Sequence, residues 1–135
     1  MKNKIILCLV IILGLFTLTG CVSDKEELVS ADSKLIGIWT MTDAKNNPED
    51  NADMDSMSIQ FFEDGKCVYS YRALTGSNKT LPFEGKVEGT CYVNSNYNKI
   101  RVDAESNANI FSKWQSLKIN DNTMTIGNYT FVKKQ

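Results

Sequence analysis

The stretch MSIQFFEDGKCVYSYRA, residues 57–73, decides the fold of this chain. Two runs rich in apolar, aromatic and β-branched residues flank the sequence EDG at residues 63–65. Asp and Gly tolerate the positive φ of a tight turn, so the stretch predicts a β-hairpin with strands at residues 57–63 and 66–73. With an antiparallel pair in the middle of the chain, we expect the segments on either side of it to form antiparallel strands as well.

The pattern of short apolar segments separated by turn residues continues on both sides of this hairpin. Gly, Asn and Asp recur at intervals of about 8 to 12 residues, which is typical of an all-β sandwich or barrel. Residues 120–122 and 127–128 predict two further tight turns. We therefore expect an all-β domain, a small antiparallel meander barrel of about eight strands. The other strands are expected at residues 35–42, 85–93, 99–103, 110–119, 123–126 and 129–133.

Alternation along these strands assigns aromatic and cysteine side chains to the barrel interior. Cys67 and Cys91 would both point inward, and on neighbouring strands in an oxidising compartment they could form a disulfide. Two small buried hydrophobic residues are the other interpretation, and both stay open. The interior of an eight-stranded barrel is either filled by side chains or holds one small ligand. The residues that would line an apolar pocket, or else fill the core, are Trp39, Phe61, Tyr69 and Tyr71.

The N-terminal residues carry a different pattern. A start with two lysines, residues 1–4, leads into an apolar run over residues 5–16. Its 12 residues match the roughly 7 to 15 of a signal-peptide core and fall short of the roughly 18 to 20 of a membrane-spanning helix. Residues 1–20 are therefore predicted to form a signal helix that exports the chain and is then removed.

The end of this segment resembles a known processing motif. Leu18, Thr19, Gly20 and Cys21 look like the lipobox of bacterial lipoproteins, in which a branched apolar residue and two small or polar residues precede an obligatory cysteine. The resemblance implies cleavage before Cys21 and a diacylglyceryl group on its sulfur, and two acyl chains suffice for stable anchoring. The expected location is the cell membrane or an outer membrane, with the domain outside the cytoplasm. Residues 21–34 are expected to form a flexible tether.

The composition of the predicted mature chain restricts the classes of function. Loss of residues 1–20 leaves 13 basic residues against 16 acidic ones, a formal net charge of −3, and only two of the basic residues are arginines. No basic run is present to neutralise phosphates, so nucleic acid is not an expected partner. Histidine is absent, which removes the commonest general base and the commonest neutral metal ligand. We expect no catalysis, no metal and no cofactor, since no phosphate loop, zinc spacing or nucleophile elbow is present.

Two acidic sets have specific alternatives. Residues 49–55 offer oxygen ligands at alternate positions, but they lack the sixth-position Gly and twelfth-position Glu of an EF-hand loop, so a solvated loop is expected. Glu84 and Glu88 are close enough in sequence to suggest the paired carboxylates of a glycosidase. The glycines beside them indicate a turn and a strand edge instead.

The chain after position 35 also resembles a family. A Gly-Ile-Trp start, a Phe strand that turns at Asp and Gly, a Gly-Thr strand and a closing hairpin look like the lipocalin-like domains of bacterial lipoproteins. The resemblance implies a small meandering β-barrel over residues 35–135. Cys91 stands where such domains often place an aromatic residue, and no arginine near the C-terminus is available to cover the Trp39 ring. The matching residues are Gly37, Ile38, Trp39, Ile59, Phe61, Asp64, Gly65, Gly89, Thr90, Lys99, Ile100, Leu117, Met124 and Ile126.

Two functions follow from these patterns. The first is a membrane-anchored, noncatalytic lipoprotein whose lipocalin-like domain binds a small apolar ligand or a protein partner. The alternative is an inhibitor or accessory protein of the cell envelope, with a filled barrel, that acts through loops expected at residues 43–56 and 75–82. An open cavity in the barrel favours the first function, and a filled interior favours the second.

Overall fold

A computed structural model describes residues 25–43 and 52–135. This part of the chain forms nine β-strands, and it contains no helix of the length and apolarity that a membrane span requires. The predicted signal helix and Cys21 lie outside the described residues. The strands are β1 (Glu26–Leu28), β2 (Gly37–Met41), β3 (Ala52–Phe61), β4 (Lys66–Thr75), β5 (Leu81–Asn94), β6 (Lys99–Asp103), β7 (Gln115–Asn120), β8 (Thr123–Ile126) and β9 (Tyr129–Lys133).

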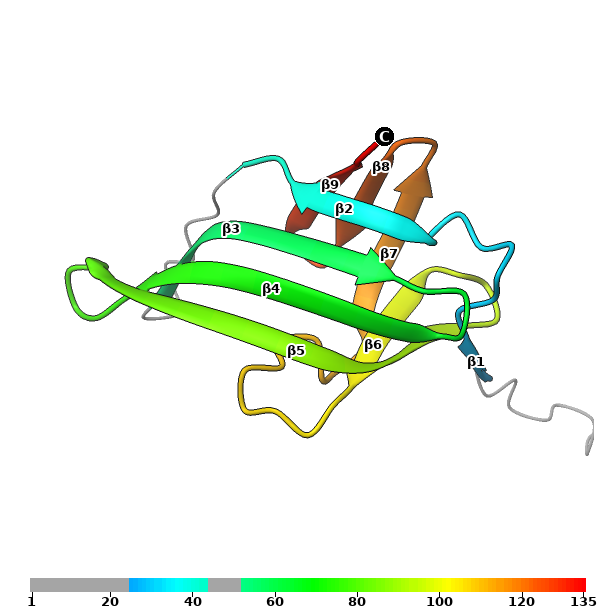
Figure 1. The fold of residues 1–135 in the computed structure, drawn as a ribbon, viewed down its shortest axis with the longest axis horizontal. Coiled ribbons are helices and arrows are strands. Elements are labelled where there is room, and N and C mark those ends of the chain that lie inside the picture. The colour runs from blue at the N-terminus through cyan, green and yellow to red at the C-terminus, as the bar shows by residue number, and fades with distance from the viewer. Residues whose placement is uncertain (1–24, 44–51) are drawn as a thin grey trace, which may run out of the picture.

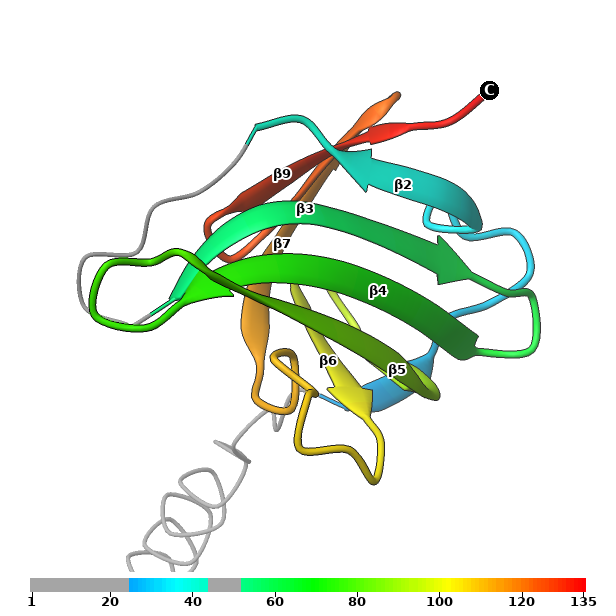
Figure 2. The same ribbon diagram turned by 60° about the vertical axis from the view of Figure 1, so that its left-hand side comes forward.

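Strands β2 to β9 close into an antiparallel barrel, to which β1 is added at the edge. Each of these strands pairs with the next one along the chain, and β9 returns to pair with β2, where Trp39 lies opposite Lys133. The long strands β3, β4 and β5 lie side by side, β6 and β7 pass behind them, and β8 and β9 lie behind β2 (Figure 1). Figure 2 shows β3 and β4 curving over the shorter strands. The predicted all-β meander barrel of eight strands is confirmed.

The core fills the inside of the barrel, as strand alternation predicts. On β4, Cys67, Tyr69 and Tyr71 are buried, while the residues between them are partly or fully exposed. Burial of a large apolar side chain contributes about 1.5–3 kcal/mol to the free energy of folding, so this interior is the main source of stability. The largest side chains that are fully buried include Trp39, Tyr69, Phe61, Phe131, Leu35, Ile59, Ile100 and Met124.

The three tight turns expected from the sequence are present. Gly65 adopts a φ of 82° between β3 and β4, and its N–H donates to the Phe62 carbonyl oxygen at 3.2 Å. Asp121 (φ 42°) and Gly127 (φ 56°) occupy the turns of the β7–β8 and β8–β9 hairpins. These left-handed conformations favour Gly, Asn and Asp, which explains why the hairpins could be located from residue types.

Strands β3 and β5 both begin earlier in the chain than predicted. Strand β3 begins at Ala52 rather than residue 57, and β5 begins at Leu81 rather than residue 85. Parts of both expected loops are therefore strands, held by ladder pairs such as Asp53 with Leu74. A register shift between Met54 and Ser56 interrupts the alternation of β3 at this point. Because of its polar residues and this irregularity, the first part of β3 lacks the period-two alternation that predicts a strand from sequence.

The predicted flexible tether is wrong at residues 26–28. These residues form β1, which pairs antiparallel with the end of β5, with Glu27 opposite Val93. The residues that follow are also fixed to the barrel, because Val29 and Leu35 are 2% and 0% exposed. Barrel packing therefore begins earlier in the chain than the composition of residues 21–34 indicated.

Candidate functional site

The four residues predicted to line a ligand pocket belong to a packed core. Trp39, Phe61, Tyr69 and Tyr71 are 0%, 1%, 0% and 8% exposed. The Trp39 indole N–H donates to the carbonyl oxygen of Leu35 at 2.7 Å. Three hollows on the protein have volumes of about 640, 380 and 470 Å³. Tyr71 contributes to the largest, and Trp39, Phe61 and Tyr69 line none of the three.

The hydroxyls of Tyr69 and Tyr71 hold the segment between β6 and β7 against the inner face of β4. The Tyr71 hydroxyl donates to the Ala108 carbonyl oxygen at 2.9 Å. The Tyr69 hydroxyl donates to Asn109 Oδ1 at 2.7 Å and accepts the Ile110 N–H at 3.0 Å. These bonds occupy the polar ends of both rings, so the two tyrosines tie a connecting segment to the core and present no free hydroxyl to an interior ligand.

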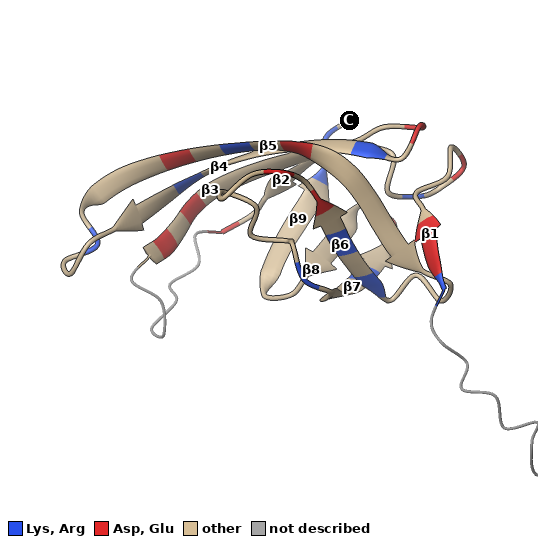
Figure 3. Ribbon diagram, turned by 90° about the horizontal axis from the view of Figure 1, so that it is seen from below, with Lys and Arg blue, Asp and Glu red and all other residues tan. Residues whose placement is uncertain are grey.

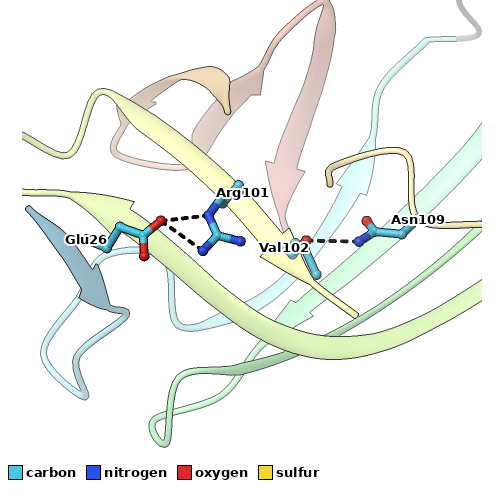
Figure 4. A network of polar contacts seen from close by, with 4 residues as sticks. All are labelled: Glu26, Arg101, Val102 and Asn109. Atoms are coloured by element: carbon cyan, nitrogen blue, oxygen red, sulfur yellow. Dashed lines mark hydrogen bonds and ion pairs between the residues drawn. The ribbon is translucent and has the colours of Figure 1, made fainter. Parts of the chain in front are cut away.

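Asn109 is the centre of this connection. Its Oδ1 also accepts the Phe111 N–H at 3.1 Å, and its Nδ2 donates to the Val102 carbonyl oxygen at 2.9 Å (Figure 4). The predicted strand at residues 110–119 is therefore wrong in its first half, and β7 begins at Gln115. The role of Asn109 was not expected from the sequence, although an Asn after a polar stretch is a common turn former.

Burial raises the pKa of Tyr69 above its usual value, and the backbone N–H groups of Phe111 and Ile110 offset part of the rise. Burial also raises the pKa of Tyr71, and the neighbouring Tyr129 hydroxyl adds to the effect. A tyrosine with a raised pKa stays protonated and keeps donating its hydrogen bond. Both groups are therefore suited to holding structure rather than to accepting a proton.

The two predicted partner cysteines lie together inside the barrel. Cys67 and Cys91 are 1% and 0% exposed, and both are free thiols in the structure. Cys67 lies opposite Gly89 on the β4–β5 ladder, so Cys91 is its diagonal neighbour. A hydrogen bond with the Cys67 thiol, together with burial, raises the pKa of Cys91. The structure thus brings the pair into contact, and the disulfide stays a prediction.

The hollow of about 640 Å³ is a groove over strands β2 to β5. Its floor contains a row of ladder partners that crosses the strands, Thr40 beside Ser58, Ser58 beside Ser70, and Ser70 beside Lys86. Small hydroxyl side chains leave the sheet surface low along this row. The groove can therefore offer hydrogen bonds to a polar surface.

Two of the cations that line the groove form ion pairs. Arg72 lies 3.6 Å from Asp55, and Lys86 lies 3.0 Å from Glu88. Outside the groove, Lys79 lies 2.6 Å from Asp53. In the acidic set at residues 49–55, these two aspartates thus face cations across the hairpin, whereas residues 49–51 lie outside the described part. Among the described residues, no group of three or more His, Cys, Asp or Glu side chains is placed to hold a metal ion.

Besides its pairing with β5, strand β1 is held to the barrel by an ion pair. Arg101 Nε and Nη2 lie 2.9 and 2.8 Å from Glu26 Oε1 (Figure 4). The Arg101 guanidinium also lies 4.7 Å from the centre of the Tyr92 ring and 5.6 Å from that of Trp114. A planar guanidinium can stack on aromatic rings and bind a carboxylate at the same time. The chain is thereby fixed to the barrel close to its predicted anchor.

No protein-family model, curated protein or solved structure matches this chain. The resemblances to bacterial lipoproteins and to lipocalin-like domains therefore rest on the residues quoted above. The fold rests on the strand pairings themselves. Function has to be inferred from the arrangement of the described side chains.

Proposed function

We propose that this protein is a noncatalytic lipoprotein, held at a membrane by lipid on Cys21, whose filled barrel presents its outer surface to a protein partner in the cell envelope. The packed interior carries this proposal, because Trp39 and Tyr69 are fully buried and their polar atoms are bonded within the chain. A filled barrel leaves the outer face and the connections between strands for recognition. This is the accessory-protein function that the sequence offered as the alternative.

The position of β1 supports a barrel held close to the membrane. Glu26, the first residue of β1, follows Cys21 by five positions. A chain spans at most about 3.3–3.6 Å per residue, so five steps reach about 17 Å. The lipid on Cys21 would therefore keep the β1 end of the barrel near the headgroups. A protein partner would therefore bind to the faces of the barrel that lie away from its β1 end.

The proposal of a noncatalytic role is supported by composition and by the roles of the buried polar groups. The chain contains no histidine. Tyr69 and Tyr71, whose pKa values burial raises, bond to the segment between β6 and β7. Groups that perform acid–base chemistry need pKa values near the working pH, and burial moves these two tyrosines away from it.

The anchor is tested with single cysteine substitutions in the full chain, expressed in a bacterium that is fed a labelled fatty acid. We expect the wild-type protein to carry the label and to enter the detergent phase on phase separation. Cys21→Ser should lose both properties, and Cys8→Ser, which changes a cysteine inside the predicted signal, should keep both. An unlabelled wild-type protein in the aqueous phase would refute the anchor.

A further inference from the structure

Strand β5 has an edge that no described strand covers over residues 81–89. On one side, β5 pairs with β4 from Leu81 to Thr90. On the other side, β6 pairs with β5 only from Thr90 to Val93. An uncovered strand edge is a template for the addition of another strand. The first part of β5 can therefore accept one.

The ladder shows which backbone groups point toward this free edge. The Cys91 N–H donates to the Gly65 carbonyl oxygen, on the β4 side. Backbone groups alternate in direction along a strand, and no register shift interrupts the β4–β5 ladder. The N–H and C=O groups of Glu84, Lys86 and Glu88 therefore point away from β4.

Strand β6 gives an independent check of this direction. The Val102 N–H donates to the Phe111 carbonyl oxygen, away from β5. Its neighbour Asp103 therefore turns its backbone groups toward β5, where it lies opposite Thr90. The backbone N–H and C=O groups of Thr90 thus point to the β6 side, and so do those of the even-numbered residues before it on β5. Within the described chain, no backbone bond outside the ladders involves Glu84, Lys86 or Glu88.

The side chains along the free edge alternate in charge. Glu84, Lys86 and Glu88 are exposed on the outer face, where Lys86 Nζ lies 3.0 Å from Glu88 Oε1, while Gly85 and Val87 between them are buried. The Lys86 ammonium has three N–H groups and can bind a second carboxylate beside Glu88. Figure 3 shows red, blue and red bands in this order along β5. Charges often protect an edge against self-association, but charges that alternate in sign can match a second copy of the same edge in a suitable register.

Only one antiparallel register fits both the charges and the free edge. A twofold axis at Lys86 places like charges opposite each other, since Lys86 meets itself and Glu84 meets Glu88. An axis at Val87 places Lys86 opposite Glu88 twice, but it brings residues 81–84 of the other copy against residues 90–93, whose edge β6 already occupies. An axis at Gly85 places Glu84 opposite Lys86 of the other copy, and this occurs twice by symmetry.

We propose that a second copy of this chain adds to the free edge of β5 with the twofold axis at Gly85. Each Glu84–Lys86 pair exchanges two backbone hydrogen bonds and forms an ion pair. On the inner face, Phe83, which is 48% exposed, lies opposite Val87 of the other copy. Pro82 lacks an N–H and falls at the end of the new ladder, where the loss is smallest.

Sedimentation equilibrium of residues 22–135, which contain every strand of the barrel, tests this dimer. We expect the fraction of wild-type chain in dimers to rise with its concentration. Glu84→Lys and Lys86→Glu should each raise the dissociation constant at least about tenfold, because both place like charges in register. A mixture of the two variants should recover dimers, since every 84–86 pair of the mixed dimer joins opposite charges. Lys118→Glu, on an exposed position of β7, is the control for net charge.

Three results would overturn the proposal. The first is a wild-type chain that stays monomeric at concentrations on the order of millimolar. The second is a dimer that Lys118→Glu weakens as much as Lys86→Glu does. The third is a mixture of Glu84→Lys and Lys86→Glu that remains monomeric although circular dichroism shows both variants to be folded.

Discussion

The ammonium group of Lys133 lies 5.3 Å from the centre of the Trp39 ring. The two residues are ladder partners where β9 meets β2 and closes the barrel. Lys133 Nζ also donates to the Lys34 carbonyl oxygen at 3.0 Å. The sequence provides no arginine near the C-terminus to cover this ring, and the structure shows that a lysine on the last strand lies there instead.

Removal of this cation should weaken the closure of the barrel. Lys133→Met keeps an aliphatic side chain but loses the charge over Trp39 and the bond to Lys34. A cation over an aromatic ring contributes about 0.5–1 kcal/mol at exposed sites, so we expect a loss of about 1 kcal/mol in the free energy of unfolding by urea. Lys134→Met, at the exposed neighbouring position, should cost less. Equal losses would show that the contact with Trp39 is not stabilising.

Removal of the Tyr69 hydroxyl should lower the free energy of unfolding more than removal of a tyrosine hydroxyl that does not hold a connecting segment to the barrel. Tyr69→Phe leaves the Ile110 N–H without its partner and removes one of the two donors to Asn109 Oδ1, which keeps the Phe111 N–H. An unsatisfied buried polar group costs about 1–3 kcal/mol, and hydrogen exchange should quicken over residues 104–114. Tyr92→Phe keeps the ring beside Arg101 and serves as the control. Unchanged exchange in Tyr69→Phe would contradict the tie between β4 and this segment.

Stability should fall at alkaline pH partly through Tyr69. Burial raises the pKa of this hydroxyl above the unfolded value of 10.0, so the folded state holds the proton more tightly. Its contribution is complete below about pH 10 and is lost as pH rises further, because the unfolded chain ionises first. Urea midpoints measured between about pH 8 and 11.5 should decline less steeply in Tyr69→Phe than in wild type. Identical slopes would contradict this assignment.

Cys67 and Cys91 should form a disulfide when the protein folds in an oxidising compartment. The two buried thiols would pass two electrons and two protons to a disulfide oxidant, and the intact mass should fall by about 2 Da. A bridge over this loop should stabilise the fold by about 3 kcal/mol. Cys67→Ala, which cannot bridge, should show no mass deficit. A wild-type chain at full thiol mass after oxidative folding would leave the pair as two buried hydrophobic residues.

Local residue chemistry predicted the parts of the fold that depend on neighbours in sequence. The hairpin at residues 57–73, its turn at Gly65 and the inward face of β4 follow from alternation and from the φ tolerance of glycine. The start of β3 does not, because Asp53 and Asp55 look like loop residues until Lys79 and Arg72 lie across from them.

The remaining differences depend on contacts between distant segments. Strand β1 consists of three exposed residues, and its position is set by the edge of β5 and by Arg101, 75 residues after Glu26. The end of the predicted strand before β7 depends on Asn109, whose partner Tyr69 lies 40 residues earlier. No local pattern contains this information, since each bond joins side chains that only the closed barrel brings together.

Native mass spectrometry of residues 22–135, purified under mild conditions and measured before and after denaturation, tests the filled barrel most directly. We expect the native spectrum to contain only the chain and its noncovalent dimer, and the denatured spectrum only the chain, with no small molecule in either, because Trp39, Phe61 and Tyr69 are fully packed. A compound of a few hundred daltons that is retained in the native spectrum and released on denaturation would contradict the filled interior. It would point instead to a ligand-carrying barrel.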